Sequence, residues 1–130
     1  MDEITVHVET EINPTEAEEK VQKAVANVFG SVYTEIQPSY RGSMLNAEAK
    51  SQEALIRFRN LLRSDRIRDA ARKALFQGIR GTTIRFCLNK QVAFAGHVSF
   101  SEEVAESPLG SIRVTIECEN PGRLVQWLTA

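Results

Sequence analysis

The side chains best suited to chemistry in this sequence are basic, and they gather in its central third. Between residues 57 and 90 only two acids, Asp65 and Asp69, oppose ten bases, so this segment carries a net charge of +8. Residues 1–20 hold seven acids against one lysine, a net charge of −6. Such an asymmetry within one small chain indicates a polyanionic partner. The ten bases are Arg57, Arg59, Arg63, Arg66, Arg68, Arg72, Lys73, Arg80, Arg85 and Lys90.

Arginine outnumbers lysine seven to one between residues 57 and 80, and this preference has a chemical meaning. A guanidinium group presents a planar fork of N–H donors that matches two phosphate oxygens, whereas an ammonium group is a point charge. The segment therefore predicts contacts to the phosphates of RNA. The side chains expected to make them are Arg63, Arg66, Arg72, Lys73, Arg80 and Arg85.

A second interpretation of this segment is a solvated helix face that neutralises its own charge. Asp69 lies three residues before Arg72 and four before Lys73, which is the spacing of ion pairs along a helix. Stacking side chains are few, because Phe86, Phe94 and Phe100 are interpreted as core residues. If RNA is the partner, we expect recognition of the backbone and shape of structured RNA rather than stacking of single-stranded bases.

Asn89, Lys90 and Gln91 are three polar residues between two apolar, alternating stretches, 83–88 and 92–100. A three-residue loop at 89–91 would place Leu88 opposite Val92 in an antiparallel hairpin and would keep the apolar side chains on one face. We therefore predict a hairpin with these three residues at its tip, where their side chains would contact the RNA backbone or base edges.

The other face of the predicted hairpin supports an alternative function. In the same register it would carry Cys87, Ala93 and Ala95, which are small enough for a second surface to pack closely against them. On this interpretation the chain is a dimeric protein-interaction or scaffold domain. A homodimer is expected on either interpretation.

Metal binding and catalysis have little support in the sequence. The two histidines and two cysteines show no spacing typical of a zinc site. The chain has no nucleophile elbow, no phosphate-binding glycine loop and no cysteine–histidine signature. We therefore expect no cofactor, no metal, no small-molecule substrate and no enzymatic activity; an enzyme would need a pocket with converging polar groups.

The periodicity of apolar residues predicts the elements that position these side chains. Residues 3–12 alternate as a half-buried strand, and a helix capped by Asn13 follows and ends at Gly30. Two strands flank residues 40–42, the first at a sheet edge because Pro38 lacks an N–H. A pair of helices ends at Gly78, three strands follow, and Pro121 opens a last short helix.

The predicted order is therefore β-α-β-β-α-α-β-β-β-α, which indicates an α+β fold with a largely antiparallel sheet and helices packed on one face. A length of 130 residues fits a single domain, 1–130. The acidic start is unlike a signal peptide, no apolar run approaches the roughly 20 residues of a membrane span, and the two cysteines do not form a disulfide framework. We expect a cytoplasmic protein without membrane contact.

Several stretches of the sequence resemble an archaeal family catalogued as uncharacterised protein family 0201. The resemblance covers essentially the whole chain, and its most specific element is "LNKQ-A--G-V-F" followed by "SPLG-I-V". The resemblance implies an α+β fold similar to that of the ribosomal protein that binds 5S ribosomal RNA, and with it a non-catalytic RNA-binding role. It also includes Asn89, Lys90 and Gln91 in the family's signature. The stretches that carry it are "LLRSDRIRDAARKALFQGI", "IRFCLNKQVAFAGHVSF", "SPLGSIRVTIE" and "LVQWLTA".

Overall fold

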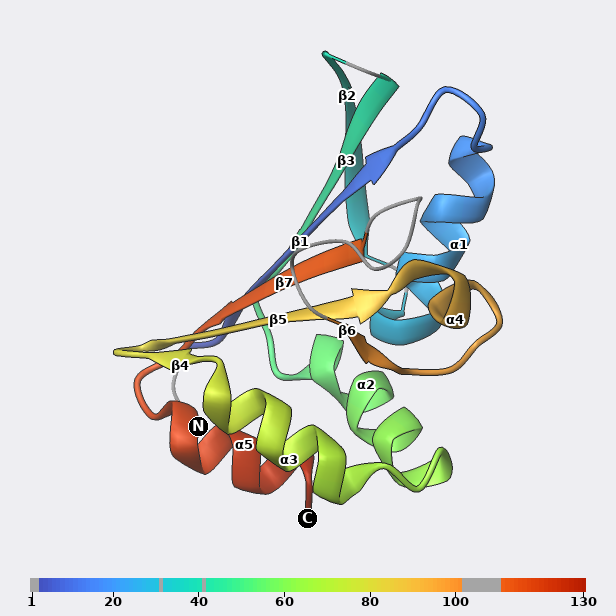
Figure 1. Cartoon of the computed structure of the whole chain (residues 1–130). Helices are drawn as coiled ribbons and strands as arrows, with labels where there is room; N and C mark the ends of the chain where they lie inside the picture. The colour runs from blue at the N-terminus through green and yellow to red at the C-terminus, as the bar shows by residue number, and fades with distance from the viewer. Residues whose placement is uncertain (1–2, 31, 41, 102–110) are drawn as a thin grey trace.

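The computed structural model describes residues 3–30, 32–40, 42–101 and 111–130, and its architecture is α+β, as predicted. Helices and strands alternate in short runs along the chain (Figure 1). The elements are β1 (Thr5–Ile12), α1 (Glu18–Phe29), β2 (Tyr33–Ser39), β3 (Gly42–Ala49), α2 (Glu53–Ser64), α3 (Arg68–Gln77), β4 (Ile79–Arg80), β5 (Thr83–Asn89), α4 (Lys90–Phe94), β6 (Phe100–Ser101), β7 (Ser111–Glu117) and α5 (Pro121–Leu128).

One antiparallel sheet holds all of these strands, in the order β2-β3-β1-β7-β5-β4, with β6 also paired to β5. The central strand β1 pairs on both sides, so Val8 lies between Ala47 of β3 and Val114 of β7. Strand β2 forms an edge, which confirms the prediction made from Pro38. The proline can stand there because an edge strand leaves some of its N–H groups outside the ladder.

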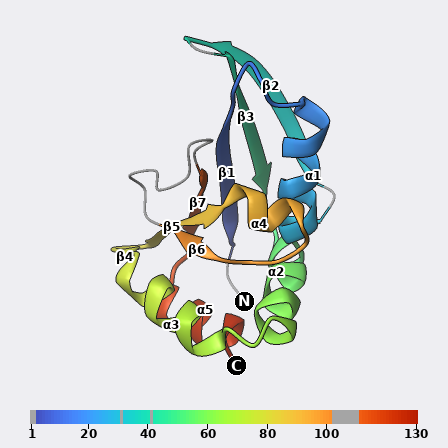
Figure 2. The same ribbon diagram turned by 45° about the vertical axis from the view of Figure 1, so that its right-hand side comes forward.

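The core lies on one face of the sheet. Buried side chains alternate along β1, β5 and β7 as predicted, and they pack against the apolar stripes of the helices. Figures 1 and 2 show α1 and α4 beside each other on this side, with α2, α3 and α5 gathered toward one end of the sheet. Phe58 of α2 sits at the centre, where its ring stacks on Phe86 with the ring centroids 5.6 Å apart.

The opposite face, which we call the open sheet face, carries no helix among the described residues. Its polar side chains follow from the register in two rows across the sheet. The first row is Glu35, Asn46, Glu9, Arg113 and Cys87, and the second is Tyr33, Glu48, His7, Thr115 and Arg85.

The predicted hairpin after β5 is wrong. Residues Lys90–Phe94 form the short helix α4, and only Phe100 and Ser101 return to pair with β5, opposite Leu88 and Cys87. The cause is local: the Asn89 side chain accepts a hydrogen bond from the Val92 N–H at 2.9 Å and so caps a helix where a turn was expected. The small outer surface of that hairpin therefore does not form, because Ala93 is buried.

Of two helix boundaries that the sequence predicted, one differs in the structure and one is confirmed. Helix α1 begins at Glu18 rather than near Asn13, because the Glu16 carboxylate accepts bonds from the Asn13 N–H and amide and ties this segment into a separate turn. Helix α3 ends at Gly78 as predicted, and glycine is required there for a steric reason, because a Cβ would lie 2.0 Å from the Arg85 carbonyl oxygen.

Among the described residues no helix has both the length and the apolar character needed to cross a membrane.

Candidate nucleic-acid interface

The segment from α2 to β4, residues 53–80, presents most of its basic side chains to solvent, and we call it the basic helix layer. Its acids are Glu53, Asp65 and Asp69. No basic side chain of this layer forms an ion pair with another residue in the described ranges. Asp69 forms no ion pair with Arg72 or Lys73, so the positive charge of these helices stays on the surface. The basic residues are Arg57, Arg59, Arg63, Arg66, Arg68, Arg72, Lys73 and Arg80, all exposed except the half-buried Arg59.

Four of these arginines hold the end of α5 by hydrogen bonds to oxygen atoms. Arg72 donates from Nε to Thr129 Oγ1 and from Nη2 to Thr129 O, both at 3.1 Å. Arg63 and Arg68 both donate to Ala130 O, at 3.3 and 3.1 Å. Arg59 donates to Trp127 O at 2.9 Å and lies over the indole ring. Cations stabilise a helix at this end because its last carbonyls carry partial negative charge.

Because the oxygens of Trp127 and Thr129 carry only partial charge, the bonds from Arg59 and Arg72 hold these two arginines in place without cancelling their charge. Arg63 and Arg68 each use one nitrogen for the contact, so further N–H donors of both side chains have no described partner. The end of α5 therefore arranges guanidinium groups of α2 and α3 beside one another on an exposed surface.

Asp65, one of the two acids within the basic stretch, faces away from the layer. Its carboxylate bonds to the loop after α4, accepting from the Val98 N–H at 2.9 Å and lying 2.9 Å from His97 Nδ1. The side chain is 13% exposed. The Val98 N–H, distant in sequence, donates to this carboxylate and so holds Asp65 against the loop rather than among the arginines.

Arg66, Lys73 and Arg80 are the predicted site residues with the greatest freedom in this layer. Arg66 and Lys73 make no hydrogen bond or ion pair with a described residue, and both are exposed. Arg66 stands in the turn between α2 and α3 with a φ of 58°, a conformation that L-residues rarely adopt. Arg80 donates from Nη1 to the carbonyls of Gln77 and Ile79, which leaves its other nitrogens open.

Arg85, which the sequence grouped with these residues, projects instead from the open sheet face. That face is mixed in charge: Arg113 donates two bonds to Glu9, at 2.6 and 3.1 Å, and Glu48 lies near His7 and Lys50. A hollow of about 1300 Å³ lies over it. Carboxylates along this surface oppose a phosphate backbone, so it is a poorer candidate for RNA than the basic helix layer.

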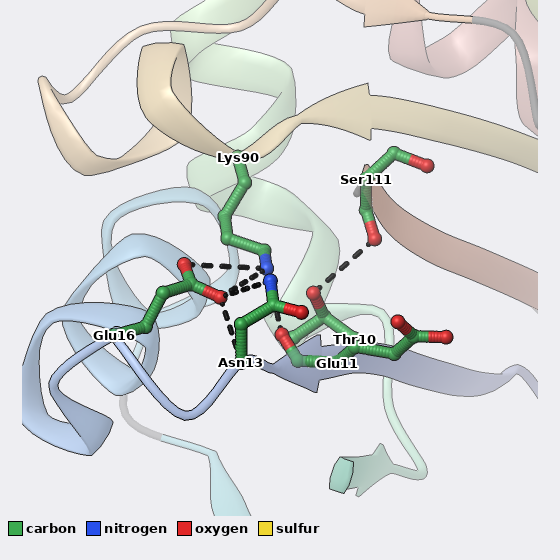
Figure 3. A network of polar contacts seen from close by, with 6 residues as sticks. All are labelled: Thr10, Glu11, Asn13, Glu16, Lys90 and Ser111. Carbon is green, nitrogen blue, oxygen red and sulfur yellow. Dashed lines mark hydrogen bonds and ion pairs between the residues drawn. The ribbon is translucent and has the colours of Figure 1, made fainter. Parts of the chain in front are cut away.

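Lys90 is also separated from the basic helix layer, and Figure 3 shows why. The side chain is only 3% exposed, and its ammonium lies 2.6 Å from Glu11 O and 3.1 Å from Glu16 Oε1. It thus fastens α4 to the turn before α1, where the same Glu16 oxygen accepts from Asn13. Asn89 is used as the cap of α4, and only Gln91 of the three predicted tip residues is exposed.

Sequence reasoning missed one cationic cluster, which lies where α4 packs on α1. Phe94, expected in the core, is 40% exposed, and the ammonium groups of Lys20 and Lys23 lie 5.9 and 5.4 Å from its ring centroid. The sequence did not indicate an exposed ring, because Val92, Phe94, Val98 and Phe100 have the spacing of apolar residues on one face of a strand. The exposure of Phe94 follows from the helix that Asn89 starts.

Neither cysteine offers a ready nucleophile. Both are buried, and burial raises the pKa of the Cys118 thiol, although a main-chain hydrogen bond at Asn120 partly counteracts this. Within the described ranges no three histidine, cysteine or acidic side chains gather as metal ligands. The geometry thus directs attention to surface charge rather than to a reacting centre.

Comparison with known proteins agrees with this emphasis. A family model described as RNA binding matches residues 5–118. The UPF0201 protein of Sulfurisphaera tokodaii is 43% identical over 122 residues, which is 94% of this chain and 84% of that protein. The UPF0201 protein of Sulfolobus acidocaldarius is 44% identical over 126 residues, covering 95% and 86%. A solved UPF0201 protein from Methanococcus jannaschii superposes with a TM-score of 0.86 at 29% identity, covering 97% and 99% of the two chains.

Proposed function

Since the chain belongs to the UPF0201 family, and a family model described as RNA binding matches most of its length, we propose that it binds RNA through phosphate contacts from the basic helix layer. The contacting groups are Arg63, Arg66, Arg72, Lys73 and Arg80. Lys90 and Asn89 are left out, because their polar atoms already hold α4 in place. Arg85 is left out because it lies on the open sheet face.

The observation that carries this proposal is the unpaired state of the cations. An exposed arginine can pair with a carboxylate three or four residues away on the same helix. Here no acidic side chain pairs with the arginines of the layer among the described residues, and oxygens of Trp127, Thr129 and Ala130, at and after the end of α5, orient the guanidinium groups. An array of oriented guanidinium groups binds phosphates, because each contact releases a condensed counterion from the RNA.

The alternative of a partner interface built from Cys87, Ala93 and Ala95 no longer has a surface to support it. Ala93 is buried on the inner side of α4, and Cys87 is buried beside β6. A homodimer stays a prediction, now without the surface on which it was based. The role proposed for the cations is binding and orientation of RNA, without a chemical step.

The test removes the two least engaged cations and measures RNA affinity against salt. The variant Arg66→Gly with Lys73→Gln deletes two positive charges, and glycine suits the positive φ at residue 66. With about four phosphates neutralised, the wild-type log–log slope of affinity against salt should be roughly −3. The double variant should bind a structured RNA more weakly and flatten that slope by about 1 per cation removed.

A matched control removes two charges from the open sheet face. Lys50→Gln with Arg85→Gln changes the net charge by the same amount at side chains outside the proposed contacts. We expect it to retain the wild-type slope. Loss of affinity in the control and not in the first variant would place RNA on the open sheet face, and no RNA binding by the wild-type protein would end the proposal.

A further inference from the structure

The cluster at the junction of α1 and α4 combines an exposed aromatic ring with cations. Phe94 ends α4, and Lys20 and Lys23 reach over its ring from successive turns of α1. Both lysines are exposed, and neither forms an ion pair with a described residue, although Glu18 and Glu19 are close in sequence. The lysines therefore bring positive charge to the ring, since an ammonium near a ring face is attracted by its quadrupole.

Hydrogen bonds to the main chain of α4 hold the segment that carries the exposed ring. The Asn27 side chain of α1 donates to the carbonyls of both Ala93 and Phe94, each at 3.0 Å. The buried pair of Lys90 and Glu16 fixes the other end of α4 to the same region. Because the main chain that carries the ring is already fixed, less conformational freedom is lost on binding, which favours the use of this ring as a platform.

The cluster is continuous with the basic helix layer. Arg57 of α2 donates from Nε to the carbonyl oxygen of Asn27 at 2.8 Å, so its guanidinium lies next to the residue that holds Phe94. A strand whose phosphates follow the layer can thus reach the ring through Arg57. The exposed Tyr33 differs, because it stands on the open sheet face near Glu35 and has no cation over its ring among the described residues.

From this arrangement we propose that Phe94 stacks one unpaired base of the bound RNA while Lys20 and Lys23 hold the neighbouring phosphate. The inference rests on the proposed function and adds a single-stranded element to it. Bases inside a duplex are already stacked and out of reach, so a lone ring on a helical surface selects an unpaired base. In the free protein the two ammonium groups lie near the Phe94 ring. When a base stacks on that ring, they leave its face and bind the neighbouring phosphate.

The experiment compares two RNAs that share a stem and differ in a single-stranded end. One is a blunt hairpin, and the other carries four unpaired nucleotides. Fluorescence anisotropy gives both dissociation constants for the wild type, for Phe94→Leu and for the control Tyr33→Ala. We expect the wild type and the control to bind the extended RNA about tenfold more tightly, and Phe94→Leu to lose this preference while its affinity for the blunt hairpin is unchanged.

Leucine keeps an apolar side chain at residue 94, so folding is preserved, and thermal unfolding verifies it. A second variant, Lys20→Gln with Lys23→Gln, should weaken binding of the extended RNA more than of the blunt one.

Equal affinity of the wild type for the two RNAs, or an unchanged preference in Phe94→Leu, would overturn the stacking site without contradicting RNA binding by the basic helix layer. Failure of the wild type to bind either RNA would overturn both proposals. Self-association that Phe94→Leu abolishes, without an effect on RNA, would assign the ring to an interface between copies.

Discussion

The basic helix layer and Lys90 are two regions that look alike in sequence and differ in structure. In the layer, arginines stand on the outer sides of amphipathic helices, and no acidic side chain pairs with them among the described residues. Lys90 points from a short helix into the protein, where a carbonyl and a carboxylate enclose its ammonium. A basic residue in the sequence therefore indicates a phosphate-binding site only when the fold exposes its side chain to solvent.

The two regions also differ in what their cations do for stability. A buried ammonium without its partners is costly, so Lys90 and Glu16 depend on each other. An exposed guanidinium is hydrated in either state, so the arginines of the layer contribute through individual hydrogen bonds of modest strength. Four substitutions test this contrast.

The largest effect is expected at the buried pair. Lys90→Met removes the cation that pairs with the Glu16 carboxylate and the donor to the Glu11 carbonyl, and should lower the free energy of unfolding by about 3–5 kcal/mol. Urea denaturation measures this. Adding Glu16→Gln should recover part of the loss, and the folded variant should bind RNA as the wild type does. Weakened RNA binding at unchanged stability would reverse the contrast and return Lys90 to the interface.

The next effect concerns the attachment of α5 to the layer. Arg72→Lys keeps the charge but loses the two hydrogen bonds to Thr129, so the free energy of unfolding should fall by about 1–2 kcal/mol. The salt slope of RNA binding should not change. Lys73→Arg is the matched control, since Lys73 has no described partner to lose. If Arg72→Lys and Lys73→Arg have the same stability, the oxygens of α5 do not hold this arginine.

A smaller effect is expected at the start of α4. Asn89→Ala removes the side chain that accepts from the Val92 N–H, and the lost cap should cost about 1 kcal/mol in urea denaturation. The exposed neighbour Gln91 provides the comparison, because Gln91→Ala should stay within about 0.5 kcal/mol of the wild type. Equal losses at the two residues would contradict the capping role of Asn89.

The smallest effect should appear at Arg66, where the substitution should not lower the stability of the fold as the other three do. Arg66→Gly relieves a left-handed backbone that costs about 1 kcal/mol, while the greater entropy of an unfolded chain with glycine offsets most of the gain. The melting temperature should stay the same or rise slightly, although a charge is lost. Arg66→Ala, which keeps the unfavourable φ, is the control. A marked fall in stability for Arg66→Gly would show that this side chain supports the fold.

Much of the fold was predictable because it depends on patterns that act locally. Alternation marked the buried side of β1, Pro38 marked the edge strand β2, and Pro121 marked the start of α5. The region after β5 was mispredicted, because the spacing of Val92, Phe94, Val98 and Phe100 is also compatible with a strand. Two side chains distant in sequence support the structure that forms there instead. Asn27 donates to a carbonyl of α4, and Asp65 accepts from the N–H of Val98 in the loop after it.

The sequence by itself determined the α+β class, the central helix pair and the excess of arginine over acid in that segment, because periodicity and composition are properties of neighbouring residues. Only the tertiary structure decided which cations meet solvent. Arg63 and Arg72 were placed beside the end of α5, Asp65 was drawn to a loop, and Lys90 was buried. Each outcome depends on which main-chain donors and acceptors come within about 3 Å of a long side chain, and folding alone brings those groups together.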